Sequence, residues 1–303
     1  MVMFARHSRE GGNPASFALR KRAWNAMSLD SRFRGNDGQE LGRGLQFWRR
    51  QTVWALVLAG LLAACAHGVP PAAGPLREAR QLVLVTTPDW NADHGTLRRF
   101  ERVDGTWQPI GDATPVMVGR NGTAWGLGLH AAAQPDGPVK REGDGRAPAG
   151  AFAIGTAFGY GAQAGTALPY AAMDAGDWCI DVPASPLYNR IVDARDVGEA
   201  AVEGSTEPMR RDLHANGDQR YRLGFVIEHN AQAVPGAGSC IFAHLWKSPT
   251  DATAGCTAMD DPAMQALLGW LDPAREPMFV LLPLAEFHRL QPTWQLPVLE
   301  PDA

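Results

Sequence analysis

Residues 150–158, GAFAIGTAF, form an apolar run of aromatic and β-branched side chains that begins at a glycine. Such a run favours an extended, buried strand over a surface helix. Similar short runs, bounded by Gly, Pro, Asn or Asp, recur on both sides of it. We therefore predict a mostly β, β-rich α+β fold. The further strands are expected at residues 81–87, 114–119, 177–182, 190–194, 223–230, 239–246 and 278–283.

One helix is expected near the C-terminal end of this β-rich region. Asp261 and Pro262 provide an N-cap and a proline at the first helical position. Apolar residues then follow at helical spacing, and Pro273 ends the pattern. The residues that form this apolar stripe are Met264, Leu267, Leu268 and Leu271. The sequence thus indicates a domain over residues 81–298 with one or two short packed helices.

The composition argues against a nucleic-acid partner. The 303 residues carry a net charge of −4, and the second half of the chain has no long run of Lys and Arg. Nucleic-acid-binding domains usually present a clustered basic face. A hydrophobic content of 45% is that of a globular protein.

An export signal precedes the domain. An apolar run at residues 54–64 follows Arg49 and Arg50, and it is too short to span a bilayer as a helix. It ends in Leu62-Ala63-Ala64-Cys65, which resembles the lipobox of bacterial lipoproteins. We expect residues 49–65 to be a lipoprotein signal with the lipid on Cys65, and residues 66–80 to be a linker. The alternative is a signal that is simply cleaved, with an accidental cysteine. The resemblance implies a periplasmic protein that is attached to the outer membrane of a Gram-negative bacterium.

The first 48 residues are expected to be unrelated to the domain. Codons for the stretch RHSRE can be chosen so that their reverse complement encodes FRGND, which occurs at residues 33–37. The stretch EGGNP is related in the same way to residues 30–32. We interpret residues 1–48 as a non-native extension that contains a translated inverted DNA repeat.

The four cysteines fall into different settings. Cys179 and Cys240 lie in strand-like segments, where they are either buried free thiols or a disulfide. Cys256 follows a small turn, Thr253-Ala254-Gly255, and precedes Thr257. A glycine there allows close approach of a substrate carbonyl, and the amides of residues 255 and 256 are candidates to hold an oxyanion.

A histidine stands upstream of this cysteine. A free thiol titrates near 8.5, so a cysteine nucleophile needs a base or a cation beside it. His244 lies at the end of the predicted strand 239–246, and a returning loop can bring it to Cys256. Taken alone, this spacing is a weak signal.

Two motifs together resemble the L,D-transpeptidases, the YkuD-type cysteine transpeptidases of bacterial cell walls. One is the His244-x11-Cys256 spacing that ends in Thr-x-Gly-Cys, and the other is KREGDGRAPAGAFAIGTAFGY at residues 140–160. The resemblance implies a β-sandwich catalytic domain, with Cys256 as nucleophile and His244 as base. Gly255, with Thr253 and Thr257 beside it, would belong to the oxyanion turn.

The same resemblance implies the substrate and the reaction. The substrate would be a peptidoglycan tetrapeptide stem, cut before its terminal D-Ala through a thioester on the cysteine. An amine acceptor would give a 3–3 cross-link, whereas water would give a tripeptide. The reaction needs no metal or cofactor.

Two positions differ from the commoner pattern of that family. Leu245 and Trp246 follow the histidine where glycine is usual, and Ala258 stands where arginine is usual. Another cation would then have to recognise the substrate carboxylate. Lys247, Arg190 and His229 are the candidates.

Several residues keep two interpretations. Trp246, His229, Tyr188 and Arg190 would either contact substrate or serve only in packing and turns. A zinc site of His229, His244 and Cys256 has no supporting spacing, and Asp144 is expected to form a turn. The alternatives for the whole chain are an L,D-carboxypeptidase and a non-catalytic cell-wall-binding lipoprotein.

Overall fold

The computed structural model describes residues 74–131 and 136–299. The predicted DNA-repeat segment 1–48, the predicted signal 49–65 with Cys65, and residues 66–73 of the predicted linker lie outside the described residues. The last part of that linker, residues 74–80, packs on the domain: Leu76 is fully buried, and the carbonyl oxygens of Leu76 and Arg77 accept hydrogen bonds from the Arg102 guanidinium. The folded domain therefore begins before residue 81.

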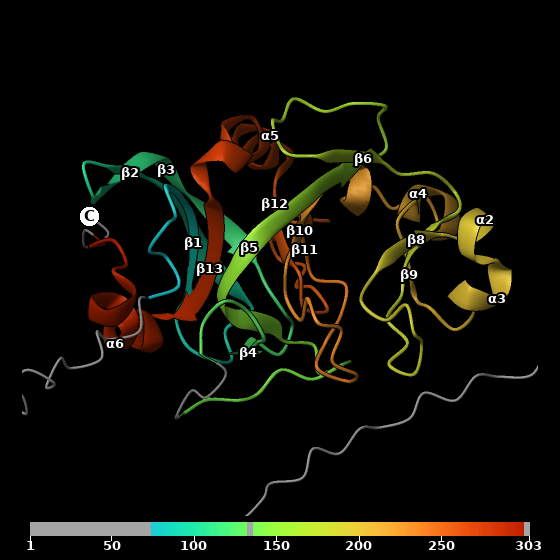
Figure 1. Cartoon of the computed structure of the whole chain (residues 1–303), viewed down its shortest axis with the longest axis horizontal. Helices are drawn as coiled ribbons and strands as arrows, with labels where there is room; N and C mark the ends of the chain where they lie inside the picture. Colours follow the sequence, from blue (N-terminus) through green and yellow to red (C-terminus); the bar gives the residue numbers. More distant parts are fainter. Residues whose placement is uncertain (1–73, 132–135, 300–303) are drawn as a thin grey trace, which may run out of the picture. The chain divides into compact units, whose positions relative to one another are not determined.

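Short strands dominate the structure, as the sequence predicts (Figure 1). The strands are β1 Gln81–Thr87, β2 His94–Val103, β3 Thr106–Met117, β4 Thr123–Trp125, β5 Ala147–Gly159, β6 Tyr170–Ala172, β7 Asp177–Cys179, β8 Ile191–Asp193, β9 Glu207–Pro208, β10 Leu223–Ile227, β11 Phe242–Leu245, β12 Thr257–Met259 and β13 Pro277–Pro283. The α-helices are α2 Ala194–Val197, α3 Glu199–Val202, α4 Arg211–His214, α5 Asp261–Trp270 and α6 Leu284–Trp294, and the 3-10 turns are η1 Arg220–Arg222 and η2 Pro273–Arg275.

Strand β5, which contains the apolar run 150–158, closes the main sheet. It pairs with β13 through residues 150–153 and with β10 through residues 154–159. The order β10-β11-β12-β3-β2-β1-β13-β5 thus returns to β10, and eight strands form a closed barrel. The mostly β prediction is confirmed, but the pairing does not separate into the two sheets of a sandwich. A long strand with two different partners at its two ends leaves no free edge there.

Strands β1 and β13 are buried on both of their faces. Every residue of β1 and β13 is buried, because these strands face the barrel interior on one side and helix α6 on the other. Helix α6 contributes Phe287, Leu290 and Trp294 to this contact. Parallel strands that are covered on both faces read as continuous hydrophobic runs, which explains why both were predictable.

Helix α5 matches its prediction except at its first residue. The four apolar residues of its predicted stripe are all buried. The N-cap is Asp260 rather than Asp261, since the Asp260 carboxylate accepts a hydrogen bond from the Ala263 amide. The helix still ends before Pro273.

A second, smaller layer lies beside the barrel on the right of Figure 1. We call residues 177–222 the cap; they form the three-stranded sheet β8-β7-β9, the short helices α2, α3 and α4, and the turn η1. Cap residues Met209 and Tyr221 pack with Phe242 and Cys256 of the barrel in one buried cluster. The cap therefore covers the outer face of β11, the strand that carries His244.

None of the helices in the described parts of the chain is long and apolar enough to cross a membrane.

Candidate functional site

Parallel pairing of β11 and β12 brings His244 and Cys256 to the same face of the sheet. Ala243 pairs with Thr257 and His244 with Ala258, so Cys256 stands just before β12 at the level of Phe242. Side chains alternate along β11: Ala243 and Leu245 join the barrel core, whereas Phe242 and His244 point toward the cap. Both predicted catalytic residues are nearly inaccessible, with exposed fractions of 3% for His244 and 7% for Cys256.

The two residues line one cavity of about 350 Å³ between the barrel and the cap. The β3–β4 loop contributes Arg120, and the cap contributes polar and cationic side chains. The other residues that line it are Thr206, Glu207, Arg211, Arg220, Tyr221, Ala252, Thr253 and Ala254. The cavity is thus lined by a cysteine, a histidine and three arginines.

The hydrogen bonds of His244 select its tautomer. Its Nδ1 lies 2.8 Å from the Leu245 carbonyl oxygen, which can only accept, so Nδ1 carries the proton. The imidazole Nε2 is then left as an acceptor. The Tyr221 ring packs edge-on against the imidazole, with 5.1 Å between ring centroids, and fixes its plane.

The Cys256 sulfur is held by main-chain groups. The Phe242 amide donates to Sγ at 3.4 Å, and the thiol donates to the Cys240 carbonyl at 3.5 Å. A thiol that donates to a carbonyl is protonated. Cys256 must therefore turn away from Cys240 before it can pass its proton to an imidazole.

Burial keeps both members of the pair uncharged. Burial, assisted by the nearby Glu207 carboxylate, raises the pKa of Cys256 to about 12. Burial also lowers the pKa of His244 to about 4, against the opposing effect of its hydrogen bond to the Leu245 carbonyl. At neutral pH the site contains a thiol and a neutral imidazole rather than a thiolate–imidazolium pair.

The turn before Cys256 is built around glycine and threonine. Gly255 has φ of +154°, and a Cβ there would lie 2.9 Å from the Arg146 carbonyl oxygen. The Gly255 amide donates to Thr253 Oγ1 at 3.0 Å, and that hydroxyl donates to the Cys256 carbonyl at 2.6 Å. The Gly255 amide is therefore used within the turn, and of the two amides considered for an oxyanion only that of Cys256 stays a candidate.

The two predicted motifs meet at this turn. Gly255 packs on Arg146, which belongs to the segment 140–160. Asp144 acts as the expected turn-former, since its carboxylate accepts hydrogen bonds from the Arg141 and Arg146 amides and pairs with Lys140. Thr257 is buried in β12 beside Ala243 and does not line the cavity.

An ion-pair network forms the cap side of the cavity. Tyr221 donates to Glu207 at 2.6 Å, and Arg211 binds the same carboxylate oxygen at 3.0 Å. Arg211 and Arg220 both bind Asp218. Although burial opposes it, these two guanidinium groups lower the pKa of Asp218. The network fixes two of the three arginines of the cavity.

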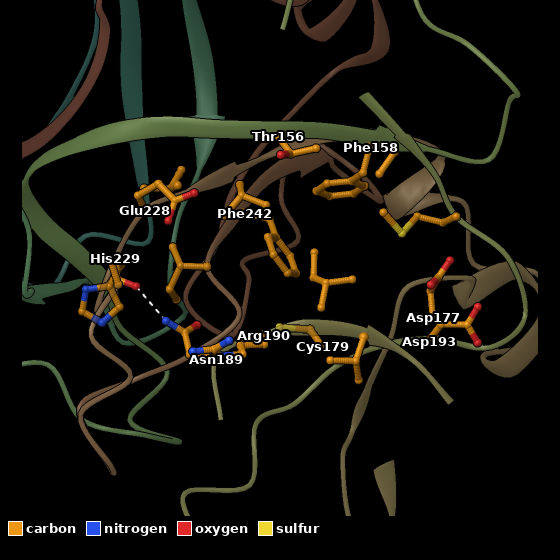
Figure 2. A pocket seen from close by; sticks show the side chains of 18 of the residues that line it. Thr156, Phe158, Asp177, Cys179, Asn189, Arg190, Asp193, Glu228, His229 and Phe242 are labelled. Carbon is orange, nitrogen blue, oxygen red and sulfur yellow. Dashed lines mark hydrogen bonds between the residues drawn. The ribbon is translucent and has the colours of Figure 1, made fainter. Parts of the chain in front are cut away.

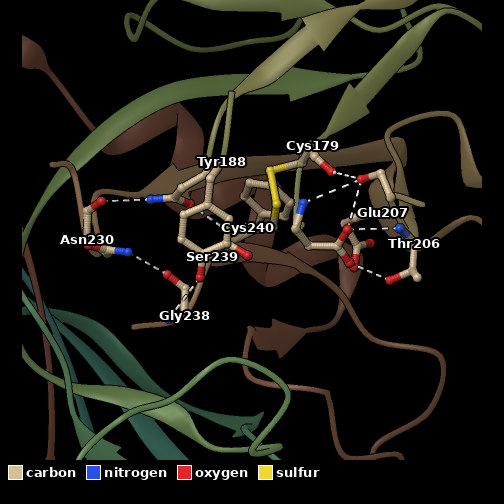
Figure 3. Close-up of a disulfide and its surroundings, with 12 residues drawn as sticks. Cys179, Tyr188, Thr206, Glu207, Asn230, Gly238, Ser239 and Cys240 are labelled. Carbon is tan, nitrogen blue, oxygen red and sulfur yellow. Dashed lines mark hydrogen bonds between the residues drawn. A yellow bond between two sulfur atoms is a disulfide. The ribbon is translucent and has the colours of Figure 1, made fainter. Parts of the chain in front are cut away.

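Cys179 and Cys240 form a disulfide, which was one of the two possibilities that the sequence left open. Figure 3 shows it linking strand β7 of the cap to the loop before β11, close to Glu207 and Thr206. Of the cysteines in the described residues, Cys256 alone is free. The disulfide thus ties the cap to the strand that carries His244.

Trp246 and Lys247 line a neighbouring cavity instead of the one around Cys256. That cavity, of about 800 Å³, shares Arg211 and Arg220 with the Cys256 cavity. The structure therefore does not support direct contact of Trp246 or Lys247 with a group that reacts at the thiol.

His229 and Arg190 line a third cavity, of about 590 Å³, which includes neither His244 nor Cys256 (Figure 2). His229 is buried, with Nδ1 accepting from the Leu127 amide and Nε2 lying 3.0 Å from the Ala237 carbonyl oxygen. Because both ring nitrogens are used by the backbone, His229 is structural. Of its two interpretations, the hydrogen bonds favour the structural one over a wall of the substrate groove.

Tyr188 is also structural. Its ring is buried, its hydroxyl donates to Glu142, and the hydroxyl oxygen accepts from the Gly238 amide. It therefore supports the loop that leads to Cys240.

The three residues considered for a zinc site are not gathered around one point. Within the described residues, the one group with ligand atoms close enough together is Asp174, Asp177 and Asp193. Two of those aspartates bind the Arg195 guanidinium. These ion pairs with Arg195 explain why the three aspartates lie close together.

The sequence alone did not identify five of the residues that line the Cys256 cavity. These are Arg120, Arg211, Arg220, Glu207 and Tyr221. The cap residues come from the segment 207–222, where charges of both signs alternate closely, which is the one signal that could have singled them out. Arg120 comes from an unrelated loop and gave no signal.

Comparisons with protein-family models, with curated proteins and with solved structures found no match in any of the three.

Proposed function

We propose that the protein is a cysteine acyltransferase of the L,D-transpeptidase type that acts on peptidoglycan stem peptides. The observation that carries the proposal is the placement of His244 and Cys256 in one cation-lined cavity, with Nδ1 of the histidine tied to the Leu245 carbonyl. A nucleophile, an imidazole with a fixed tautomer and a source of positive potential are the parts that acyl transfer needs.

The chemistry starts from uncharged groups. As Sγ of Cys256 attacks the carbonyl carbon of the scissile amide, Nε2 of His244 takes the thiol proton. The Cys256 amide stabilises the oxyanion. The C–N bond then breaks, the leaving D-Ala amine takes the proton from Nε2, and a thioester is left on Cys256.

The second half-reaction decides the product. The amine of an acceptor stem attacks the thioester and passes its proton to Nε2, a new C–N bond forms, and the C–S bond breaks with return of the proton to sulfur. This route gives a 3–3 cross-link. Water in place of the amine gives a tripeptide, which would make the protein a carboxypeptidase.

Muropeptide mass spectrometry tests the proposal. Purified protein is incubated with tetrapeptide-bearing muropeptides, and Cys256→Ala and His244→Asn are compared with the unaltered protein. We expect 3–3 dimers or tripeptides from the unaltered protein and neither from the Cys256→Ala variant. Tetrapeptides that bind but stay intact with folded, unaltered protein would favour the cell-wall-binding alternative.

A further inference from the structure

We infer that Arg120 binds the carboxylate of the terminal residue that leaves during acylation, so that the site reads the free C-terminus of its substrate. The inference rests on the proposed function for the identity of the peptide. It concerns an arginine that has no part in the proton transfer between Cys256 and His244. Arg120 lines the Cys256 cavity, yet its guanidinium has no carboxylate partner among the residues that the structure describes.

The other two arginines of the cavity are already neutralised. Arg211 pairs with Glu207 and Asp218, and Arg220 pairs with Asp218. A substrate carboxylate would have to displace one of these partners to bind there, and breaking a partly buried ion pair is costly. Arg120 can accept a carboxylate without such a loss.

The backbone fixes Arg120 close to the reacting residue. Its amide donates to the Thr253 carbonyl at 2.9 Å, and Gly119 forms a β-bridge with Thr253, three residues before Cys256. The loop that bears the guanidinium and the turn that bears the thiol are therefore joined directly.

A glycine supports the guanidinium. A Cβ added to Gly145 would lie 3.1 Å from both Nε and Cζ of Arg120, so the arginine side chain rests against this glycine. Arg120 is an exposed residue, but its guanidinium lies against Gly145. A planar guanidinium placed in this way can bind a carboxylate through two parallel N–H groups.

The chemistry of the leaving group matches this placement. The scissile amide nitrogen of a tetrapeptide stem belongs to the terminal residue, whose carboxylate is only one carbon further along. We expect a cation in the same cavity as the thiol to meet that carboxylate when the amide carbonyl lies at the sulfur. A peptide that continues beyond this residue, or that ends in an amide, offers no such charge.

Binding measurements test the inference apart from turnover. The Cys256→Ala protein is titrated by calorimetry with a tetrapeptide that ends in free D-Ala and with the same peptide as its C-terminal carboxamide. We expect the acid to bind about tenfold to a hundredfold more tightly than the amide. Adding Arg120→Ala should remove that preference. Arg120→Lys should retain part of it, because lysine keeps the positive charge but cannot bind the carboxylate through two parallel N–H groups.

The matched control is Arg80→Ala in the same background. Arg80 is an exposed arginine before β1 that lines none of the three cavities described above, and its replacement should leave the preference unchanged. Equal binding of acid and amide, no binding of either, or a preference that survives Arg120→Ala would each overturn the inference.

The same peptides separate this inference from the proposed function. Turnover of the acid by protein with Cys256 intact tests the acyltransfer. Acid-selective binding that depends on Arg120, without turnover, would leave the inference standing and overturn the proposed function. Equal turnover of the acid and the amide that is also unchanged by Arg120→Ala would support the proposed function and overturn the inference about Arg120.

Discussion

At the scale of single residues, burial sets the protonation of His244 and Cys256, the proposed catalytic pair. The thiol of Cys256 donates to a main-chain carbonyl, and Nδ1 of His244 is fixed by another. A pair that is neutral at rest needs substrate before proton transfer occurs, and this protects the sulfur from adventitious reaction. Two predictions follow from the directions of these pKa shifts.

The first concerns alkylation of Cys256. Because its pKa is raised to about 12, the thiolate fraction should increase about tenfold for each pH unit between 7 and 10. The rate of iodoacetamide labelling, followed by peptide mass spectrometry, should rise in the same proportion. In a matched control, Val298→Cys in a Cys256→Ala background, the exposed thiol should level off near pH 9. A plateau for Cys256 below pH 8 would indicate a thiolate–imidazolium pair instead.

The second concerns the pH dependence of acylation. His244 acts as a base only when neutral, and its lowered pKa of about 4 keeps it neutral to well below pH 6. The acid limb of kcat/KM should therefore lie near pH 4 to 5 rather than at the ordinary histidine value of about 6.5. Replacing His244 by Asn should lower kcat/KM by about 10² to 10⁴ at pH 7. An acid limb at pH 6.5 would mean that the imidazole is solvated in the working enzyme.

At the scale of elements, the disulfide and the ion-pair network hold the cap over β11. Cys179 and Cys240 are 61 residues apart, so the bridge closes a long loop. In the chain-entropy view, such a loop adds about 4 kcal/mol to the free energy of unfolding. We therefore expect the disulfide to contribute much of the stability that holds the cap on the barrel.

Replacing both cysteines tests this role. The Cys179→Ser, Cys240→Ser protein should lose about 2 to 4 kcal/mol of stability in urea unfolding, and Cys256 should become more accessible to iodoacetamide. The Ser205→Ala protein, altered beside the disulfide at a hydroxyl that donates to the Cys179 carbonyl, serves as the control and should lose about 1 kcal/mol. Equal stability of the double variant and the unaltered protein would contradict the account.

The sequence predicts some elements and not others for identifiable reasons. Strands β1 and β13 are continuous apolar runs because both of their faces are covered, whereas β5 is buried at its two ends and partly exposed at residues 153–156. Strand β2 was missed because its buried residues do not alternate regularly. Residues 95 and 97 are buried, but after a bulge between Leu97 and Arg99 the next buried residue is 100. Its arginines also hide the pattern: Arg99 and Arg102 lie over the rings of Trp270 and Trp107.

At the scale of the whole molecule, barrel closure and cap together assemble the site. His244 and Cys256 were singled out by their spacing together with the second motif at residues 140–160, and the parallel pairing of β11 with β12 brings them to one face. Arg120, Glu207 and Tyr221 were not, because they come from a distant loop and from the cap, and only the tertiary structure brings them to the sulfur. The sandwich expectation failed for a similar reason, since no local pattern reveals that β5 also pairs with β10.

Buried histidines should make the stability of the domain dependent on pH. Burial lowers the pKa of His229, like that of His244, to about 4, below the value of about 6.5 in an unfolded chain. Between pH 4 and 6.5 the unfolded state binds more protons, so stability is fully present above pH 6.5 and is lost as the pH falls toward 4. Each histidine contributes on the order of 3 kcal/mol to this change.

The His229→Asn variant isolates one of these contributions. It removes a titrating group that takes no part in the proposed chemistry, while its amide can still accept from the Leu127 amide. Urea unfolding at pH 4, 5, 6 and 7 should show a shallower loss of stability toward acid than in the unaltered protein. Parallel curves for the two proteins would show that His229 titrates normally in the folded state.

The most direct test of the central claim is a search for the acyl-enzyme itself. Protein with an intact Cys179–Cys240 disulfide is mixed with a tetrapeptide stem, quenched in acid, and weighed by intact-mass and peptide mass spectrometry. We expect a tripeptide acyl group in thioester linkage on Cys256, removed by hydroxylamine and absent from the Cys256→Ser and His244→Asn variants. Release of D-Ala without a Cys256 adduct in the unaltered protein, or an adduct that persists at full level in His244→Asn, would contradict it.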